Sequence, residues 1–208
     1  MHRLAISTLG LLALAACQRE PVETVTPASP TPVEAAAATS VAVEGWQTDP
    51  AAYPLIGKTL PGFTATLHGG AAVTQDALRG HWTILGFWNQ SSDDSVADAR
   101  YIQALNSAVG QDPDLDLLTI HIPPTPESLG TTLDAWFTTQ GGPWPTVLDS
   151  DGKIATSFGI ATPPSYLLVG PDLTIEGYRG ALNATPDDGI KSVIRGVAEI
   201  RKQIAAPG

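Results

Sequence analysis

The residues best placed to do chemistry lie at 92–95, where the sequence reads Ser-Asp-Asp-Ser after an apolar run. A serine hydroxyl can act as a nucleophile when a base and an oxyanion hole are positioned beside it. No Gly-x-Ser-x-Gly segment surrounds either Ser92 or Ser95. Ser92 as the N-cap of a helix, with Ser95 in the first turn, accounts for both residues without catalysis. The sequence therefore favours a structural role for these two serines over nucleophilic catalysis.

Three acidic residues beside these serines form a candidate carboxylate cluster. Asp93 and Asp94 are adjacent, and Asp98 lies one helical turn beyond Asp94 on the same face. Hard cations such as Ca²⁺ bind several oxygen ligands, but this spacing matches no known calcium-binding loop. Acids in the first turn of a helix usually stabilise its positive end. We therefore predict no metal site and no cofactor here.

The histidines and the aromatic residues give no stronger indication of a site. His81 and His121 adjoin apolar runs without a nearby Cys or Met, which favours structural or surface roles over metal binding. His68 lies in a Gly-rich turn and is predicted to be solvated. Core or rim packing is the prediction for three further aromatic residues, Trp136, Phe137 and Trp144.

The only cysteine of the chain, Cys17, follows a segment with the layout of a secretory signal. Residues 14–17 read Leu-Ala-Ala-Cys, which matches a bacterial lipobox, so we predict a lipoprotein signal peptide over 1–16 and a diacylglycerol on Cys17. The alternatives are an ordinary signal peptide or a short membrane anchor. An apolar run of about 13 residues is too short to span a bilayer, which needs about 20. Gln18 favours the outer membrane over retention at the inner one.

Composition divides the remaining chain into a tether and one domain. Residues 17–52 are rich in Pro and Ala without helical or strand periodicity, which predicts an extended tether after the lipidated cysteine. Residues 53–208 are enough for a single domain with its own core. The chain carries 11 Lys and Arg against 21 Asp and Glu, a net charge of −10. This charge argues against a nucleic-acid partner and against adsorption on anionic lipid without the acyl anchor.

The domain alternates strand and helix patterns, which predicts a central mixed sheet with helices on both faces. Apolar runs at 82–88 and 115–122 are typical of buried strands, and 145–148, 165–169 and 173–178 are predicted as shorter strands. A hairpin is expected around residues 68–70. Helices are predicted from Ser92 to Gly110, from about 129 to 140, and from Pro186 to 204 with Thr185 as the cap.

Four short motifs recur in order along the segment from Leu55 to Leu182: Ile-Gly-Lys at 56–58, Leu-Arg-Gly at 78–80, Phe-Trp at 87–88 and Phe-Gly-Ile at 158–160. With them the segment resembles the thioredoxin-like superfamily, specifically the TlpA/ResA-type envelope thiol–disulfide proteins. Pro163, Pro164 and Ser165 fall where this family carries a cis-proline loop, with Pro164 at the matching position. The resemblance implies a thioredoxin-like α/β fold in three layers, with that loop facing the redox helix and receiving an extended peptide.

The same resemblance places the two redox cysteines of the family at Ser92 and Ser95, where no thiol is present. Arg100 also replaces a proline often found beyond the first turns of the helix. A serine cannot form a disulfide, so we predict a redox-inactive lipoprotein that binds an envelope protein or an extended peptide near Ser92 and Pro164. The alternatives are a thiol–disulfide oxidoreductase or peroxiredoxin-related protein of the AhpC/TSA type, and a purely structural envelope protein.

Overall fold

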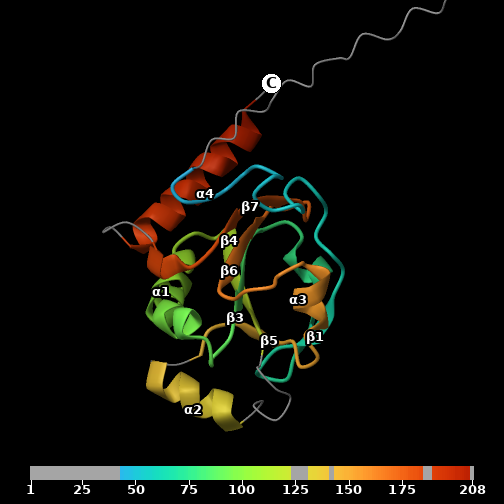
Figure 1. Ribbon diagram of the computed structural model, residues 1–208. Helices are drawn as coiled ribbons and strands as arrows, with labels where there is room; N and C mark the ends of the chain where they lie inside the picture. Colours follow the sequence, from blue (N-terminus) through green and yellow to red (C-terminus); the bar gives the residue numbers. More distant parts are fainter. Residues whose placement is uncertain (1–42, 123–130, 141–142, 185–188, 207–208) are drawn as a thin grey trace, which may run out of the picture. The chain divides into compact units, whose positions relative to one another are not determined.

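A five-stranded mixed sheet forms the centre of the domain in the computed structural model, which describes residues 43–122, 131–140, 143–184 and 189–206 (Figure 1). The strand order is β5-β4-β3-β6-β7. β3 pairs in parallel with β4, and β4 with β5, whereas β6 runs antiparallel to both β3 and β7. The predicted mixed sheet is therefore confirmed. Its strands are β3 (Trp82–Trp88), β4 (Leu115–His121), β5 (Thr146–Leu148), β6 (Ser165–Val169) and β7 (Ile175–Arg179).

Helices cover both faces of this sheet, as the sequence predicted. α1 (Asp93–Val109) and α4 (Ile190–Ala205) lie on one face, and α3 (Lys153–Ser157) lies on the other, on the side of the hairpin β1–β2 (Figure 1). α3 was not predicted, because five residues are too few to establish a helical period. The remaining elements are β1 (Thr64–Thr66), β2 (Ala72–Thr74), η1 (Gln75–Leu78), α2 (Thr131–Gln140) and η3 (Leu182–Ala184).

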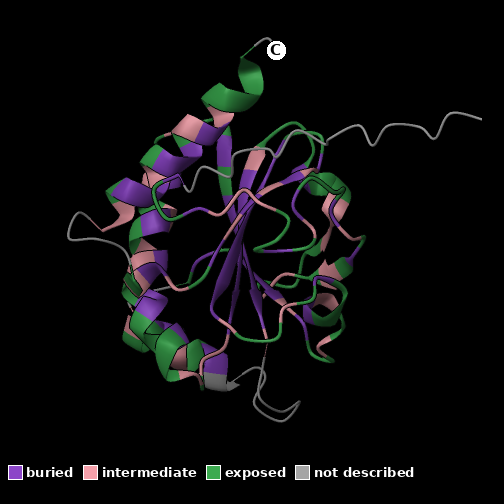
Figure 2. Ribbon diagram, turned by 45° about the horizontal axis from the view of Figure 1, so that its top comes forward, coloured by how far each residue is buried: buried purple, intermediate pink, exposed green. Residues whose placement is uncertain are grey.

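The sheet separates two apolar clusters because successive side chains of a strand point to opposite faces. In β3, Ile84 and Trp88 pack toward α1 and α4, whereas Leu85 and Phe87 pack toward α3. Buried residues accordingly run along the sheet and along the inner stripes of the helices (Figure 2). Val96 lies outside the buried stripe of α1 and is 39% exposed. No helix among the described residues is long and apolar enough to cross a membrane.

The packed domain begins earlier than the predicted boundary at residue 53. Trp46 is fully buried between α4 and β7, and its indole N–H donates to the carbonyl of Val193 at 3.1 Å. Gln47 forms an antiparallel bridge with Tyr178 of β7. The residues from 43 to 52 therefore belong to the domain rather than to the tether. The sequence did not predict this, because the single Trp of the segment lies among Pro- and Ala-rich residues without strand or helix periodicity.

Gly196 of α4 lies against the Trp46 indole, and this contact gives a first prediction. A Cβ at position 196 would lie 2.5 Å from Trp46 Cδ1 and 2.9 Å from the Val43 carbonyl oxygen. Gly196→Ala raises helix propensity, yet overpacking costs about 1–3 kcal/mol, so we expect a net loss of about 1–2 kcal/mol in the free energy of unfolding. Urea denaturation measures it. Ala198→Gly, at an exposed position of the same helix, is the control and should lose only about 1 kcal/mol. An unchanged or increased stability of Gly196→Ala would contradict the packing argument.

α4 begins later than the sequence predicted. The proposed cap Thr185 and first helical residue Pro186 lie outside the described residues. In the structure the helix starts at Ile190, preceded by Gly189 at φ 59° and ψ −132°. A helix cannot continue through that backbone conformation, so Gly189 sets the start of α4.

Candidate functional site

The two loops that the sequence singled out lie at the same end of the central sheet. β3 runs toward the 92–95 segment, and its Phe87 is paired with Ser165 at the start of the antiparallel strand β6. The cis peptide bond between Pro163 and Pro164 immediately precedes Ser165. The C-terminal end of β3, which continues into the serine-containing helix start, therefore lies beside the N-terminal end of β6, which follows the proline loop. The pairing of these strands places both loops at one end of the sheet.

The serines at 92 and 95 are both engaged in holding the start of α1. Ser92 is the N-cap, and its hydroxyl accepts a hydrogen bond from the Ser95 N–H at 3.5 Å. Ser95 is fully buried, and its hydroxyl accepts from the Asn89 N–H at 3.1 Å. Among the described residues neither hydroxyl is hydrogen-bonded to a histidine, a lysine or a carboxylate. The arrangement thus provides no activated nucleophile.

The three acids near these serines do not form a cluster. Asp93 and Asp94 are exposed in the first turn of α1, where they favour the positive end of the helix. Asp98, one helical turn beyond Asp94, is fully buried whereas Asp94 is exposed, so the two carboxylates do not gather at one site. Among the described residues no group of three His, Cys, Asp or Glu side chains is arranged to hold a metal ion.

Asp98 instead connects α1 to the sheet and to η3. Its Oδ2 accepts from the Tyr166 hydroxyl at 3.0 Å and from the Leu182 N–H at 2.7 Å, and its Oδ1 accepts from the Asn183 N–H at 2.7 Å. Burial raises the pKa of Asp98 above its ordinary value, an effect that the hydrogen bonds from Leu182, Asn183 and Tyr166 partly offset. Gly86 leaves room for the Tyr166 ring, because a Cβ there would lie 2.9 Å from it.

The loop before β6 has the geometry that the sequence predicted for it. The Pro163–Pro164 bond is cis, and Pro164 and Ser165 are buried. The Ser165 hydroxyl donates to the Thr162 carbonyl at 3.0 Å and lies 3.4 Å from the Tyr178 hydroxyl. Thr162 itself is exposed. Residues 163 and 164 carry no backbone N–H, so the loop offers carbonyl acceptors but no donor at these two positions.

His121, at the end of β4, is buried beside Trp88 without a hydrogen-bond partner. Both of its nitrogens are unpaired among the described residues, and the Trp88 ring lies 4.7 Å away. Burial, with a smaller contribution from His68, lowers the pKa of His121 to about 4. The predicted structural role of His121 fits this packing. The predicted aromatic packing is also found: Trp88, Trp136, Phe137 and Trp144 pack against one another, with Trp88 and Trp136 stacked and the other pairs tilted or edge-on.

Of the other two histidines, His81 lies where the sequence allowed and His68 does not. His68 is not simply solvated: its side chain is 21% exposed, its Nε2 lies 2.9 Å from Asp134, and its ring meets Phe137 edge-on. His81 is half exposed beside Asp116 at 3.5 Å and has the surface position that the sequence allowed. Cys17 lies outside the described residues.

The comparisons with known proteins place this arrangement in a family. The sequence model of the AhpC/TSA family matches residues 56–178, which span the sheet from before β1 to β7. The chain belongs to the AhpC/TSA family. No curated protein sequence matches it. The TlpA/ResA-type subgroup named from the sequence stays a prediction for this AhpC/TSA member.

Solved structures show the same fold at low sequence identity. The solution structure of a putative protein disulfide isomerase from Bacteroides thetaiotaomicron matches with a TM-score of 0.58 and 21% identity, covering 70% of this chain and 89% of that one. A putative thioredoxin from Neisseria meningitidis gives 0.58 and 20%, covering 73% and 95%. A putative thiol:disulfide interchange protein DsbE from Chlorobium tepidum gives 0.56 and 12%, covering 69% and 96%. These similarities confirm the thioredoxin-like fold of this AhpC/TSA member.

Proposed function

We propose that this AhpC/TSA-family protein is a redox-inactive binding module that docks an extended segment of an envelope protein between Ser92 and the cis Pro163–Pro164 loop. The observation that carries the proposal is that both serines form hydrogen bonds that hold the start of α1. Ser92 caps α1 and Ser95 is buried against Asn89, so the positions that the resemblance assigns to redox cysteines hold the helix start together. The adjacent loop before β6 has a cis peptide bond and lies at the same end of the sheet.

The loop restricts the chemistry of its occupant. Extended peptides add to a protein edge through main-chain hydrogen bonds, with donors and acceptors on both sides. Pro163 and Pro164 lack N–H groups, so the acceptors must be the Pro163 carbonyl and the lone pair of the Thr162 carbonyl that the Ser165 hydroxyl does not use. The docked segment must therefore present N–H or side-chain donors to this loop. A proline-rich segment, which has few N–H groups, would be a poor occupant.

The membrane attachment belongs to the same proposal. A diacylglycerol on Cys17 would hold the domain at the membrane, with the shortened tether from residue 18 to about 42 as a spacer. We place the protein in the bacterial envelope, facing the periplasm and at the outer membrane. The sequence supports this through the lipobox at 14–17 and the Gln18 that follows it.

An insulin-reduction assay tests the redox half of the proposal. With dithiothreitol as reductant, the purified full chain should not accelerate insulin precipitation above the buffer rate, because Ser92 and Ser95 carry no thiol. The double variant Ser92→Cys/Ser95→Cys should gain turnover, since it restores two thiols at a helix start. Cys17→Ser controls for the remaining thiol. Turnover by the natural chain, retained in Cys17→Ser, would overturn the redox-inactive assignment.

Site-specific photocrosslinking tests the binding half. A photoreactive residue at Ser91 or Thr162, both exposed and on either side of the proposed surface, should capture the same envelope protein in intact cells. Lys153 in α3, on the other face of the sheet, is the control position. Equal capture at Lys153, or no adduct at Ser91 and Thr162, would contradict docking at this end of the sheet and favour a purely structural role.

A further inference from the structure

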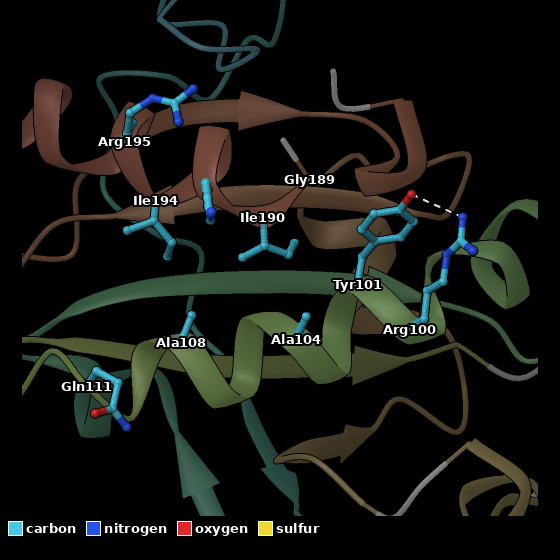
Figure 3. A pocket seen from close by; sticks show the side chains of 10 residues that line it. Arg100, Tyr101, Ala104, Ala108, Gln111, Gly189, Ile190, Ile194 and Arg195 are labelled. Carbon is cyan, nitrogen blue, oxygen red and sulfur yellow. Dashed lines mark hydrogen bonds between the residues drawn. The ribbon is translucent and has the colours of Figure 1, made fainter. Parts of the chain in front are cut away.

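A groove of about 970 Å³ lies between α1 and α4, and neither the Ser92 loop nor the Pro163–Pro164 loop lines it (Figure 3). Ile190 and Ile194 extend from α4 toward Ala104 and Ala108 of α1, which form the floor (Figure 3). These two isoleucines also pack against the buried cluster on this face of the sheet. The groove is therefore an open apolar extension of the core rather than a polar surface depression.

The exposed stripe of α1 in this groove has the spacing of a helix-packing seam. Tyr101, Ala104, Ala108 and Gln111 line the groove at intervals of three, four and three residues. Alternating steps of three and four residues keep one helix face directed at a second helix. The other face of α1 is occupied by the core, through residues such as Ile102 and Leu105. α1 thus carries a second stripe along about 15 Å, or nearly three turns, which faces Ile190 and Ile194 of α4 across the open groove.

The charge around the groove is opposite to the charge of the chain. Among the residues that the structure describes, the lining includes the three cations Arg100, Lys191 and Arg195 and no carboxylate, although the chain carries −10 overall. Arg195 is paired with Glu44 at 3.0 Å. Arg100 lies over the Tyr101 ring at 4.8 Å and donates to its hydroxyl, which fixes the guanidinium beside the apolar floor. The groove thereby combines an apolar floor with a basic rim.

From this floor, stripe and rim we infer that the α1–α4 groove binds an amphipathic α-helix of a partner protein, with carboxylates flanking its apolar stripe. Amphipathic helices bind grooves through apolar residues spaced three and four apart. Flanking carboxylates would meet Arg100 and Lys191, which gives the pairing its charge selectivity. A second copy of this chain fits poorly, because a two-fold contact through the groove would bring the same three cations against one another.

A binding selection with defined peptides tests the inference. The probe is a library of 18-residue helical peptides with leucine fixed on one face and Glu, Lys, Gln or Ser varied on the flanks, selected on the immobilised full chain. The natural chain should enrich Glu over Lys at the flanks at least tenfold. The Arg100→Glu/Lys191→Glu variant should reverse the preference to Lys. Ala104→Glu, which places a charge on the exposed floor, should enrich no sequence.

Matched controls separate the groove from the rest of the surface. Ser107→Glu is exposed on α1 outside the lining, and Lys153→Glu is exposed on α3, so both should select the same acidic peptides as the natural chain. Three outcomes would each overturn the inference. They are enrichment without a charge preference, an unchanged preference in the Arg100→Glu/Lys191→Glu variant, and no enrichment on the natural chain.

Two direct measurements exclude the other occupants. In analytical ultracentrifugation the full chain carrying Cys17→Ser should stay monomeric up to about 100 μM, whereas a dimer lost in Ala104→Glu would assign the groove to a second copy. The same chain should not bind vesicles of phosphatidylglycerol and phosphatidylcholine in a 1:3 ratio. Vesicle binding that Ala104→Glu abolishes would assign the groove to anionic lipid instead.

Discussion

Replacing Asp98 with alanine is expected to lower the free energy of unfolding of the domain by about 3 kcal/mol. The substitution removes the acceptor for the Leu182 and Asn183 N–H groups and for the Tyr166 hydroxyl, all at 2.7–3.0 Å. A buried donor left without a partner costs about 1–3 kcal/mol. Removing a carboxylate that burial disfavours offsets part of that loss. Urea denaturation at pH 7 with a constant m value measures the effect.

The matched control is Asp94→Ala, which removes an exposed acid one helical turn away and should change stability by no more than about 0.5 kcal/mol. Asp98→Asn should lie between the two variants. Its amide oxygen can still accept from Leu182 and Tyr166, but its NH₂ group then faces the N–H of Asn183. Equal stabilities of Asp98→Ala and Asp94→Ala would show that the contacts of Asp98 contribute nothing to the fold.

The pH dependence of the same variants gives an independent check. The folded-state pKa of Asp98 is raised, so the native domain binds more protons than the unfolded chain between the ordinary pKa of 3.8 and the raised value. Stability from this group therefore falls as the pH rises through that window. Asp98→Asn should lose this contribution, and Asp94→Ala should keep it.

Asp98 also shows what the sequence could and could not predict. Its neighbours Asp93 and Asp94 made an acidic, exposed helix start the obvious interpretation. Yet position 98 lies four residues before Ile102, and that spacing alone would have placed it on the buried face of α1. The partners that make a buried carboxylate tolerable come from β6 and η3, far along the chain. No local sequence pattern predicts hydrogen bonds between residues so far apart along the chain.

The strands and helices with long apolar patterns were predicted well for the opposite reason. Residues 82–88 form β3 with the predicted bounds, because a strand buried on both faces reads as a continuous apolar run. Trp46 and α3 escaped prediction, since a single buried Trp in a Pro-rich segment and a five-residue helix produce no period. The groove between α1 and α4 could not be predicted from the sequence either, because the two helices lie far apart along the chain and come together only in the fold.

His121 should make the domain sensitive to acid, and His121→Leu should remove much of that sensitivity. The folded-state pKa of His121 is lowered to about 4, against about 6.5 for an exposed histidine. The unfolded chain therefore binds the extra proton first as the pH falls below about 6.5. Integrated down to pH 4, this linkage costs the folded domain about 3 kcal/mol, since each pKa unit corresponds to about 1.4 kcal/mol.

Urea denaturation of the natural chain and of His121→Leu at several pH values between 8 and 4 measures this contribution. At pH 8 the variant should be at least as stable as the natural chain, because leucine has nearly the size of histidine and leaves no buried nitrogen unpaired. The stability difference should then widen by about 3 kcal/mol toward pH 4. His81→Gln, at a half-exposed position, is the control and should follow the natural chain. Parallel curves for His121→Leu and the natural chain would mean that His121 is protonated in the folded domain as easily as in the unfolded chain, and its burial beside Trp88 would then carry no electrostatic cost.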